Sequence, residues 1–457
     1  MEKGMELSGK KVLVVGMAES GIAATRFLLA RGAKVVVSEL KGEEVVAEKA
    51  MALRALGATV ETGGHSRESF LSAELIVVSP GVPLGIPGLA EARRKNIPII
   101  SEIELAYRFA RGRIIGITGA NGKTTTTTLV GEILRKAGFR VEVVGNIGRP
   151  FINYAEREVD YFVLELSSFQ LEAIDHFRAD IAVLLNITPD HMDRYSSFED
   201  YAEAKGRIFL NQREDDFAVV NLDDPVSRKI AEKVGSKLIW ISRTRELSEG
   251  VFVSGDRVSY RLGDGKGKVI PLSEIALFGV HNLENVLSAV AVALIVGARP
   301  EPLREVLRSF KGLPHRLEFV AEIEGIRFFN DSKATNIDAV AKAIESFESP
   351  LILILGGRDK NGDFSALIPL IKKRVKTVLT IGEAAKKIEG ILGDVVPLRR
   401  VSSLAEAVKV GFSEGKPGDT VLLSPGCASF DMFLNFEERG DVFKEEVRKL
   451  KRRRENA

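Results

Sequence analysis

The chain has 457 residues, 45% of them hydrophobic and 28% charged, which is typical of a soluble globular protein with about three domains. A formal net charge of +2 argues against a large nucleic-acid footprint, and a single cysteine excludes an internal disulfide framework. The start of the chain lacks the apolar core of a signal peptide, and its most apolar stretch falls short of the roughly 18 residues that span a bilayer. We therefore expect a cytoplasmic protein with neither a nucleic-acid nor a membrane partner.

Short β-branched runs alternate with helical patterns along almost the whole chain, which predicts an α/β fold built on parallel sheets. Many runs end in glycine or a small polar residue, so the carboxyl ends of the strands face loops suited to ligands. We expect a Rossmann-like domain at 1–101, a central P-loop ATPase-type domain at 102–312 and a second Rossmann-like domain at 313–457. The expected strands are 11–16, 34–39, 74–81, 113–119, 161–166, 181–186, 217–222, 351–357, 377–382 and 420–426.

The first domain opens with a strand, a glycine turn, a helix and a second strand that ends in Glu39. This order resembles a dinucleotide-binding unit, but Ala18 stands between Gly16 and Gly21, where a glycine normally lets the backbone touch a pyrophosphate. A nicotinamide site is therefore disfavoured. Simple packing of a helix on a strand would explain Gly21, but it would not explain the loop that ends in Gly81.

A second glycine-rich turn, GANGKT at 119–124, lies between an apolar strand and a helix that begins TTTTT. Glycines let backbone N–H groups turn toward phosphate oxygens, and the start of the helix adds partial positive charge. Lys123 can reach the β and γ phosphates, and the Thr124 hydroxyl suits Mg²⁺. A full P-loop motif would need glycine at Ile117, so this ATP-binding loop is a shortened version.

Three residues after the loop are candidate metal ligands. Glu165 ends the next predicted strand, where a carboxylate could complete a magnesium shell. His191 follows a strand and a loop proline, and taken alone it could equally be a structural turn residue. Lys205 lies in a helical pattern, and spacing alone favours a lysine on the helix surface.

The motifs TGANGKTTTT, GNIG, ELSSFQLE, NITPDHMDR and Y-x-x-A-K together resemble those of the Mur ligases of peptidoglycan synthesis, which use the shortened loop. Folylpolyglutamate synthetases share the loop and the ligase chemistry. The later motifs FGVHNLEN, GLPHRLE, FFNDSKATN, LGGRDKNGDF and SPGCASFDMFLNFEERG are similar to those of the branch that adds D-glutamate. The resemblance spans all three predicted domains.

This resemblance implies an ATP-dependent ligase that uses two Mg²⁺ ions. It implies that Lys205 is the lysine that becomes carbamylated, which would turn a cation into an oxygen anion able to help place a metal. Lys123, Glu165, His191 and Lys205 are then the expected catalytic residues, and Thr124, Glu165, His191 and Lys205 the metal-side residues. The ATP-binding residues it implies are Gly119, Asn121, Gly122, Lys123, Thr124, Thr125, Asn282, Asn285, Arg316, Asp331 and Lys333.

The resemblance also implies the substrates, UDP-N-acetylmuramoyl-L-alanine and D-glutamate, and a monomeric enzyme. The UDP-sugar would contact Glu19, Ser20, Glu39, Lys41, Gly81 and Asn146. D-glutamate would contact Thr335, Lys360, Ser429, Phe430 and Phe436. The alternatives are a folylpolyglutamate synthetase, a Mur ligase for another amino acid or, from a different class, a P-loop kinase or a nucleotide-gated binding protein.

Overall fold

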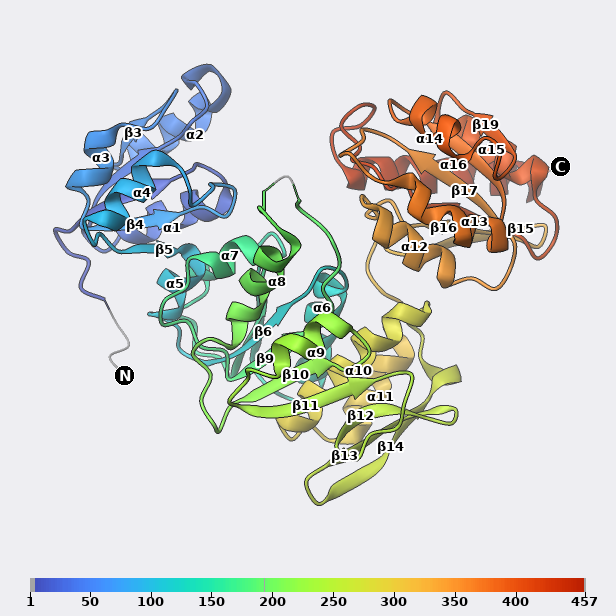
Figure 1. Cartoon of the computed structure of the whole chain (residues 1–457), viewed down its shortest axis with the longest axis horizontal. Helices are drawn as coiled ribbons and strands as arrows, with labels where there is room; N and C mark the ends of the chain where they lie inside the picture. The colour runs from blue at the N-terminus through green and yellow to red at the C-terminus, as the bar shows by residue number, and fades with distance from the viewer. Residues whose placement is uncertain (1–4, 193, 456–457) are drawn as a thin grey trace. The chain divides into compact units, whose positions relative to one another are not determined.

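The computed structural model describes residues 5–192 and 194–455, without the side chains of Val280 and His281. Three sheets follow one another along the chain (Figure 1). The chain divides into two compact units, one of Met1–Leu272 with Asn285–Val306 and the other of Ser273–Glu284 with Leu307–Ala457. The first unit holds two of the sheets and the second unit holds the third.

The first sheet is wholly parallel and has the order β3-β2-β1-β4-β5. Successive side chains of β1 point to opposite faces: Val12 and Val14 pack beneath α1 and α2, while Leu13 and Val15 pack beneath α3 and α4. The strands are β1 Lys11–Val15, β2 Lys34–Ser38, β3 Thr59–Glu61, β4 Leu75–Val78 and β5 Ile99–Ser101; the helices are α1 Glu19–Leu29, α2 Glu43–Ala55, α3 Arg67–Ser72, α4 Pro87–Arg94 and α5 Glu102–Tyr107.

The second sheet has the order β14-β13-β12-β11-β10-β9-β6-β8-β7 and is parallel from β7 to β12. Its strands are β6 Arg113–Thr118, β7 Val141–Gly145, β8 Tyr161–Glu165, β9 Ile181–Leu184, β10 Phe217–Asn221, β11 Lys237–Ser242, β12 Gly250–Ser254, β13 Arg257–Leu262 and β14 Gly265–Pro271. Its helices are α6 Lys123–Lys136, η1 Phe151–Asn153, α7 Ser168–Glu172, α8 Phe198–Gly206, η2 Arg207–Phe209, α9 Pro225–Ala231, α10 Val280–Ile295 and α11 Pro300–Ser309, with η3 Leu272–Glu274 before α10.

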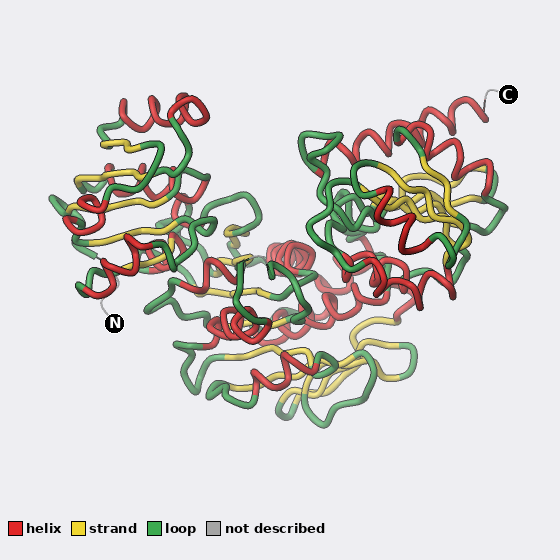
Figure 2. Tube along the Cα trace, turned by 45° about the horizontal axis from the view of Figure 1, so that its top comes forward, coloured by secondary structure: helices red, strands yellow, loops and turns green. Residues whose placement is uncertain are grey.

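The third sheet has the order β15-β16-β20-β17-β18-β19, and only the β15–β16 pair is antiparallel. Helices cover both of its faces (Figure 2): α12, α13 and α14 pack on one, and α15 and α16 on the other. The strands are β15 Glu318–Ile323, β16 Ile326–Asn330, β17 Leu351–Gly356, β18 Val375–Ile381, β19 Leu398–Arg400 and β20 Thr420–Leu423; the helices are α12 Ile337–Glu345, η4 Phe364–Leu367, α13 Ile368–Arg374, α14 Ala385–Leu392, α15 Leu404–Glu414 and α16 Phe436–Glu455.

Every strand predicted from an apolar run is present. The antiparallel strands β13, β14 and β15 were not predicted, because they are partly exposed and carry charged side chains among their apolar ones. The first two sheets share one continuous apolar core. The domain boundaries at residues 101 and 312 therefore stay predictions.

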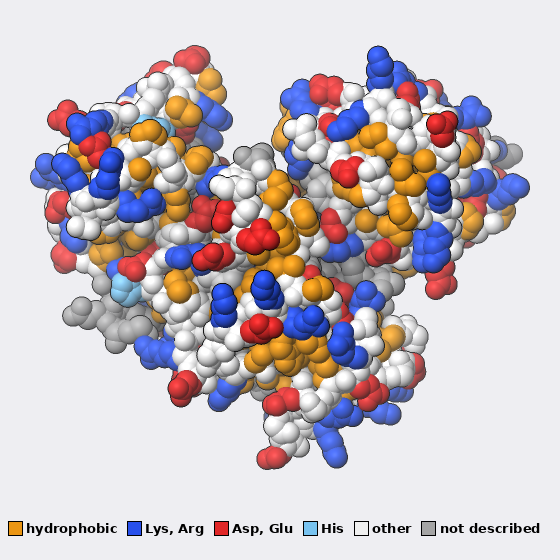
Figure 3. Space-filling view, viewed as in Figure 1, with side chains coloured by type: hydrophobic (Ala, Val, Ile, Leu, Met, Phe, Trp, Pro, Cys, Tyr) orange, Lys and Arg blue, Asp and Glu red, His pale blue; other side chains and the backbone are white. Residues whose placement is uncertain are grey.

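The surface carries charges of both signs. On the face drawn in Figure 3, Lys and Arg side chains are interspersed with Asp and Glu, as a formal net charge of +2 suggests. Among the described helices, none is both long and apolar enough to cross a membrane.

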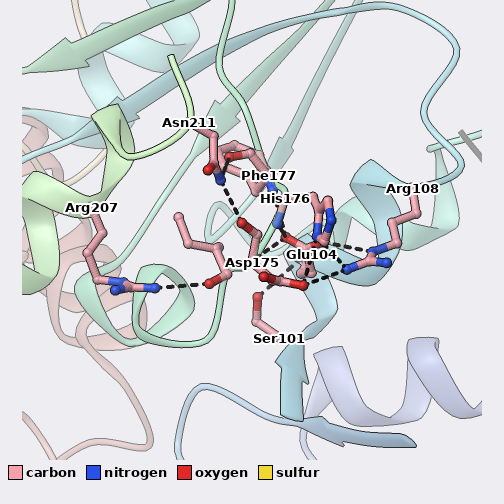
Figure 4. Close-up of polar contacts among 9 residues, drawn as sticks. Ser101, Glu104, Arg108, Asp175, His176, Phe177, Arg207 and Asn211 are labelled. Carbon is pink, nitrogen blue, oxygen red and sulfur yellow. Dashed lines mark hydrogen bonds and ion pairs between the residues drawn. The ribbon is translucent and has the colours of Figure 1, made fainter. Parts of the chain in front are cut away.

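A buried carboxylate anchors α5, the helix that leads from the first sheet to the second (Figure 4). Glu104 is fully buried, and its Oε2 accepts backbone N–H groups from Asp175, His176 and Phe177 at 2.9, 2.9 and 2.7 Å. Its Oε1 accepts Nε of Arg108 at 2.8 Å. Four donors thus saturate the carboxylate and fix the turn before β9.

We expect Glu104→Ala to lower the free energy of unfolding by roughly 2–5 kcal/mol, because three backbone N–H groups and one guanidinium lose their acceptor. The measurement is chemical denaturation followed by fluorescence. Asp175→Ala is the control: its side chain is 60% exposed, so its ion pair with Arg108 should contribute less than about 1 kcal/mol. Equal losses in the two variants would contradict the anchoring role.

Glu102 begins the same helix and is buried, but only one of its two carboxylate oxygens accepts a hydrogen bond among the described residues. Its Oε1 accepts the N–H of Ile152 at 2.7 Å, while its buried Oε2 has no partner among the described residues. Burial raises the pKa of Glu102 from 4.5 to about 7. Ionising this carboxylate therefore costs stability.

Because the folded-state pKa lies above the unfolded one, the stabilisation from Glu102 is complete below pH 4.5 and is lost as the pH rises through about 7. We expect Glu102→Gln to abolish this loss, so that its stability relative to the wild type rises by about 2–3 kcal/mol between pH 5 and pH 8. Denaturation curves across this range measure the effect. Glu158→Gln, at a side chain that is 74% exposed, is the control, and a parallel pH dependence of wild type and Glu102→Gln would refute the prediction.

Candidate active site

A glycine-rich loop joins β6 to α6 at the carboxyl edge of the second sheet. Gly122 has a φ of 85°, in the left-handed region, and caps the start of α6. A Cβ on Gly122 would collide with Oδ1 of Asn285, and one on Gly119 would lie 3.0 Å from Cβ of Leu185. Both positions therefore require glycine.

Asn186, which the sequence analysis did not single out, braces this loop. Its backbone O accepts the N–H of Ala120 at 2.8 Å, and its Oδ1 accepts the N–H of Asn121 at 2.9 Å. Its Nδ2 donates in return to Asn121 O at 3.1 Å. The available signal was its place as the last residue of the predicted strand 181–186.

Two lysine ammonium groups meet at one carbonyl of the loop. Nζ of Lys123 donates to Gly119 O and Ala120 O, each at 2.9 Å. Nζ of Lys205, from α8, donates to the same Gly119 O at 2.9 Å. The loop thus holds two lysine Nζ groups where phosphate oxygens are expected.

Lys205 is buried, so its assignment to a helix surface is wrong: the spacing placed it on a helix correctly but could not reveal which face. Its Nζ lies 4.7 Å from the ring centroid of Tyr201. Burial, and then the charge of Lys123, holds the pKa of Lys205 well below 10.5, while the charges of Asp190 and Glu165 act in the opposite direction. The neutral form of the Lys205 amine is therefore more populated than in an ordinary lysine.

Glu165 ends β8, the strand beside β6, and is buried. Its Oε1 accepts Nδ2 of Asn146 at 3.1 Å, and its backbone O accepts the N–H of Asn146 at 2.9 Å. Its other oxygen, Oε2, is buried with no partner among the described residues. An orphaned carboxylate oxygen beside the proposed phosphate loop suits a hard cation, and the metal-ligand role of Glu165 stays a prediction.

His191 has a φ of 56°, which is uncommon for a residue other than glycine. Its Nε2 lies 3.6 Å from Oδ2 of Asp190, and its ring packs edge-on against Phe169 at 4.9 Å between centroids. Its side chain is 45% exposed, which leaves it accessible to ligands.

Within the described part of the chain, one group of three acidic and histidine side chains lies close enough to share an ion: Glu104, Asp175 and His176. Arg108 already donates to this group (Figure 4), and a cation there would meet its positive charge. The group does not include Glu165 or His191, so their metal assignment stays a prediction.

The two asparagines predicted to hold adenine make different contacts. Oδ1 of Asn285 accepts the hydroxyl of Thr126 on α6 at 3.1 Å, which places Asn285 beside the phosphate loop. Asn282 instead donates through Nδ2 to Phe278 O at 2.6 Å. Thr124 and Thr125 occupy the first turn of α6, as expected.

At the carboxyl edge of the first sheet, the carboxylate of Glu39 accepts hydrogen bonds from two backbone N–H groups. Its Oε2 accepts the N–H of Met17 at 2.8 Å, and its Oε1 accepts the N–H of Lys41 at 3.1 Å. Glu19 and Ser20 begin α1, just after Met17, whose N–H donates to Glu39. The space beside Gly81 is open, since nothing lies within 4 Å of a Cβ built there. The predicted UDP-sugar residues therefore share the carboxyl edge of the first sheet, except Asn146 in the second.

In the second unit, three loops meet at the carboxyl ends of the adjacent strands β16, β20 and β17. Asp331 is buried, its Oδ2 accepting the hydroxyl of Ser424 at 2.9 Å and its Oδ1 the N–H of Leu317 at 3.2 Å. Burial raises the pKa of Asp331 to about 7. Arg316 precedes Leu317 and lies next to this carboxyl.

Arg439, another residue missed from the sequence, ties two of these loops together. It is buried, and its guanidinium donates to Ser332 O at 2.8 Å, to Cys427 O at 3.1 Å and to Ala428 O at 3.3 Å. It lies within the motif SPGCASFDMFLNFEERG, but nothing in the motif shows that its side chain is buried or which carbonyls it contacts.

The predicted D-glutamate residues lie on these same loops and on α16. Lys360 is exposed, and no hydrogen bond or ion pair engages its ammonium among the described residues. Ser429 is buried, Phe430 is 63% exposed, and Thr335 is half-buried. Phe436 begins α16, and Nζ of Lys333 lies 5.2 Å from its ring centroid.

Three family models match successive parts of the chain: the "Mur ligase MurD-like, N-terminal domain" at 10–101, the "Mur ligase middle domain" at 117–293 and the "Mur ligase, glutamate ligase domain" at 315–427. Curated relatives named UDP-N-acetylmuramoylalanine--D-glutamate ligase include one from Acidobacterium capsulatum, 50% identical over 97% of each chain. Another, from Koribacter versatilis, is 49% identical over 98% of this chain and 99% of its own.

Solved structures share the fold at low identity. A pseudomurein peptide ligase type C from Methanothermus fervidus is 19% identical with a TM-score of 0.61, covering 97% of this chain and all of its own. A UDP-N-acetylmuramate-alanine ligase from Thermotoga maritima is 19% identical with a TM-score of 0.56 and the same coverage. The predicted three-domain α/β fold is confirmed. Identity of about half over nearly the whole length establishes that the chain belongs to the Mur ligase family.

Proposed function

We propose that this protein is an ATP-dependent ligase that joins D-glutamate to UDP-N-acetylmuramoyl-L-alanine, acting as a monomer in the cytoplasm. The observation that carries the proposal is the convergence of Lys123 and Lys205 on Gly119 O, beside the orphaned oxygen of Glu165. This arrangement suits the transfer of a phosphoryl group between two anions. The name shared by the curated relatives gives the acid and the amino acid.

The reaction has two steps. The carboxylate of UDP-N-acetylmuramoyl-L-alanine attacks the γ-phosphate of ATP in line, which forms an acyl phosphate and releases ADP. The amine of D-glutamate then attacks the acyl carbon, loses a proton and expels orthophosphate from a tetrahedral intermediate. Because a carboxylate must approach a triphosphate, neutralising negative charge is the main demand on the site.

The side chains divide this work. Lys123 gives up its bonds to Gly119 O and Ala120 O and binds the β and γ phosphates, while the start of α6 adds its partial positive charge. Glu165, Thr124 and His191 would hold Mg²⁺, which supplies Lewis-acid stabilisation of the transferring phosphoryl group. Asn146 orients Glu165 so that Oε2 stays available.

Lys205 has the properties needed for carbamylation. A neutral amine adds to CO₂, forms an N–C bond and loses a proton, and burial with a neighbouring cation favours that neutral form. The resulting anion would remove the repulsion between Lys205 and Lys123 and give the site one more oxygen ligand. The predicted second Mg²⁺ would be held there.

Asp331, Arg316 and Lys333 are proposed to serve the nucleotide, with Asn282 and Asn285 at the adenine. Thr335, Lys360, Ser429, Phe430 and Phe436 are proposed to receive D-glutamate. An ammonium that makes no hydrogen bond or ion pair among the described residues, as at Lys360, suits a carboxylate of the amino acid. Glu19, Ser20, Glu39, Lys41 and Gly81 are proposed to seat the UDP group, and Asn146 is proposed to lie near the muramoyl part of the same substrate.

The amino-acid specificity is tested by phosphate release with ATP, Mg²⁺, UDP-N-acetylmuramoyl-L-alanine and one candidate amino acid at a time. We expect release with D-glutamate and none with L-glutamate, L-lysine or diaminopimelate, together with a product of the expected mass. Phosphate release without any amino acid would indicate a hydrolase instead, and ADP formed together with a stable phosphorylated product, without phosphate release, would indicate a kinase. Substrate labelled with ¹⁸O in its carboxylate should deliver one labelled oxygen to the orthophosphate.

Lys123→Ala should lower kcat by at least about 10²–10³, because one preorganised cation at the transferring phosphoryl group is lost. Lys136→Ala, at the far end of the same helix, is the matched control. Its ammonium pairs with Glu305 at the surface, so turnover should stay within about twofold of the wild type. Steady-state kinetics on both variants, with circular dichroism to check the fold, makes the comparison. A Lys123→Ala enzyme of near-normal rate would exclude the loop from the reaction.

A further inference from the structure

The side chain of Arg194 connects the second sheet to a loop of the first. Its Nη1 donates to Pro80 O at 3.2 Å, and its Nη2 donates to Val82 O at 3.0 Å. Nη2 also reaches Oε2 of Glu172 at 3.3 Å, and the side chain is 15% exposed. The two carbonyls flank Gly81, the loop residue proposed to border the UDP group.

Arg194 is also joined directly to the turn that carries His191. The N–H of Arg194 donates to His191 O at 2.9 Å, which closes the turn in which His191 takes its left-handed conformation. The Arg194 guanidinium lies 4.4 Å from the ring centroid of Phe169, and the ring of His191 packs on the same Phe169. A shift of Arg194 would therefore move His191 through both backbone and side-chain contacts.

The same contacts continue toward Lys205. The hydroxyl of Tyr195 donates to Oε1 of Glu172 at 2.5 Å, so Glu172 receives both Arg194 and Tyr195. The ring of Tyr195 packs on that of Tyr201 at 5.3 Å between centroids, and Lys205 lies over Tyr201. A continuous set of packed groups thus leads from the loop around Gly81 to the two lysines.

We propose that Arg194 is a positioning residue that ties the Pro80–Val82 loop to the turn carrying His191. Seating of the UDP-sugar acid on that loop and placement of His191 beside the phosphate loop then occur together. The inference rests on the proposed function, because it takes the Gly81 loop as the UDP-sugar subsite. It assigns to Arg194 a role in turnover as well as in substrate binding.

A plain structural brace between the two sheets is the competing explanation, and the chain contains one for comparison. Arg31, just after α1, forms an ion pair with Glu156 of the second sheet's domain and lies 3.4 Å from the ring centroid of Phe27. It touches neither the Pro80–Val82 loop nor the His191 turn in any of its described contacts. Arg31→Met therefore reports what loss of a brace alone does.

The first experiment compares Arg194→Met, Arg194→Lys and Arg31→Met by steady-state kinetics. We expect Arg194→Met to raise KM for UDP-N-acetylmuramoyl-L-alanine about tenfold and to lower kcat roughly tenfold to hundredfold, since small displacements at reacting groups are costly. Arg194→Lys should recover part of both, because an ammonium can still reach one carbonyl. Arg31→Met should change neither constant more than about twofold. Equal effects of the two methionine variants would overturn the proposal.

The second experiment is a double-mutant cycle with His191→Ala. If Arg194 acts on turnover through His191, Arg194→Met should lower kcat in the wild-type background but leave it within about twofold in the His191→Ala background. Effects that multiply would show that Arg194 acts independently of His191 and would overturn the proposal.

Calorimetric titration with UDP-N-acetylmuramoyl-L-alanine separates failure of this inference from failure of the proposed function. A wild-type protein that does not bind this compound contradicts the proposed function itself. A wild-type protein that binds it, with Arg194→Met binding equally well and turning over normally, contradicts the role of Arg194 alone.

Discussion

The candidate active site is built around one carbonyl oxygen that accepts hydrogen bonds from two lysine side chains. Gly119 O receives Nζ of both Lys123 and Lys205, so two lysine side chains converge where phosphate is expected. Burial, and then the charge of Lys123, holds the pKa of Lys205 well below its usual value, so protonating both lysines at once costs free energy. If the proposed function is right, these side chains are oriented before the substrate arrives, which is the condition for stabilising a transferring phosphoryl group.

That carbonyl can be presented only because the loop around it is tightly constrained. Gly122 turns in the left-handed region against Asn285, Gly119 packs against Leu185, and Asn186 braces the intervening backbone. The constraint comes from parallel strands, since β6, β8 and β9 are neighbours and end at the same edge. Glu165 ends β8 on one side of β6, and Asn186 comes just after β9 on the other side, so the two residues flank the phosphate loop.

The sequence predicted the parts of this site that depend on local pattern and missed those that depend on the fold. Apolar runs located the strands, and glycines with GKT located the phosphate loop, because both signals are contiguous. The burial of Lys205 could not be read from helix spacing, since it depends on which face of α8 meets the loop. Arg194 and Arg439 were given no role for a similar reason: their acceptors include backbone carbonyls of Pro80, Val82 and Ser332, far away in sequence, and a carbonyl has no sequence signature. The half-exposed strands β13 and β14 were missed because their cross-strand pairing, and not an apolar run, defines them.

The hydrogen-bond partners of the buried carboxylates explain why one of them is the better candidate for a cation. Glu104 accepts hydrogen bonds from four donors. Both carboxylate oxygens of Glu39 accept backbone N–H groups. Glu102 keeps one orphaned oxygen, but its pKa of about 7 lets a proton meet that need. Glu165 also keeps an orphaned oxygen, and it alone of these four lies on the strand next to the phosphate loop, among charges that act on Lys205. A buried carboxylate oxygen without a hydrogen-bond donor is costly, so Glu165 is the member of this set that a cation beside the proposed phosphate loop would stabilise most.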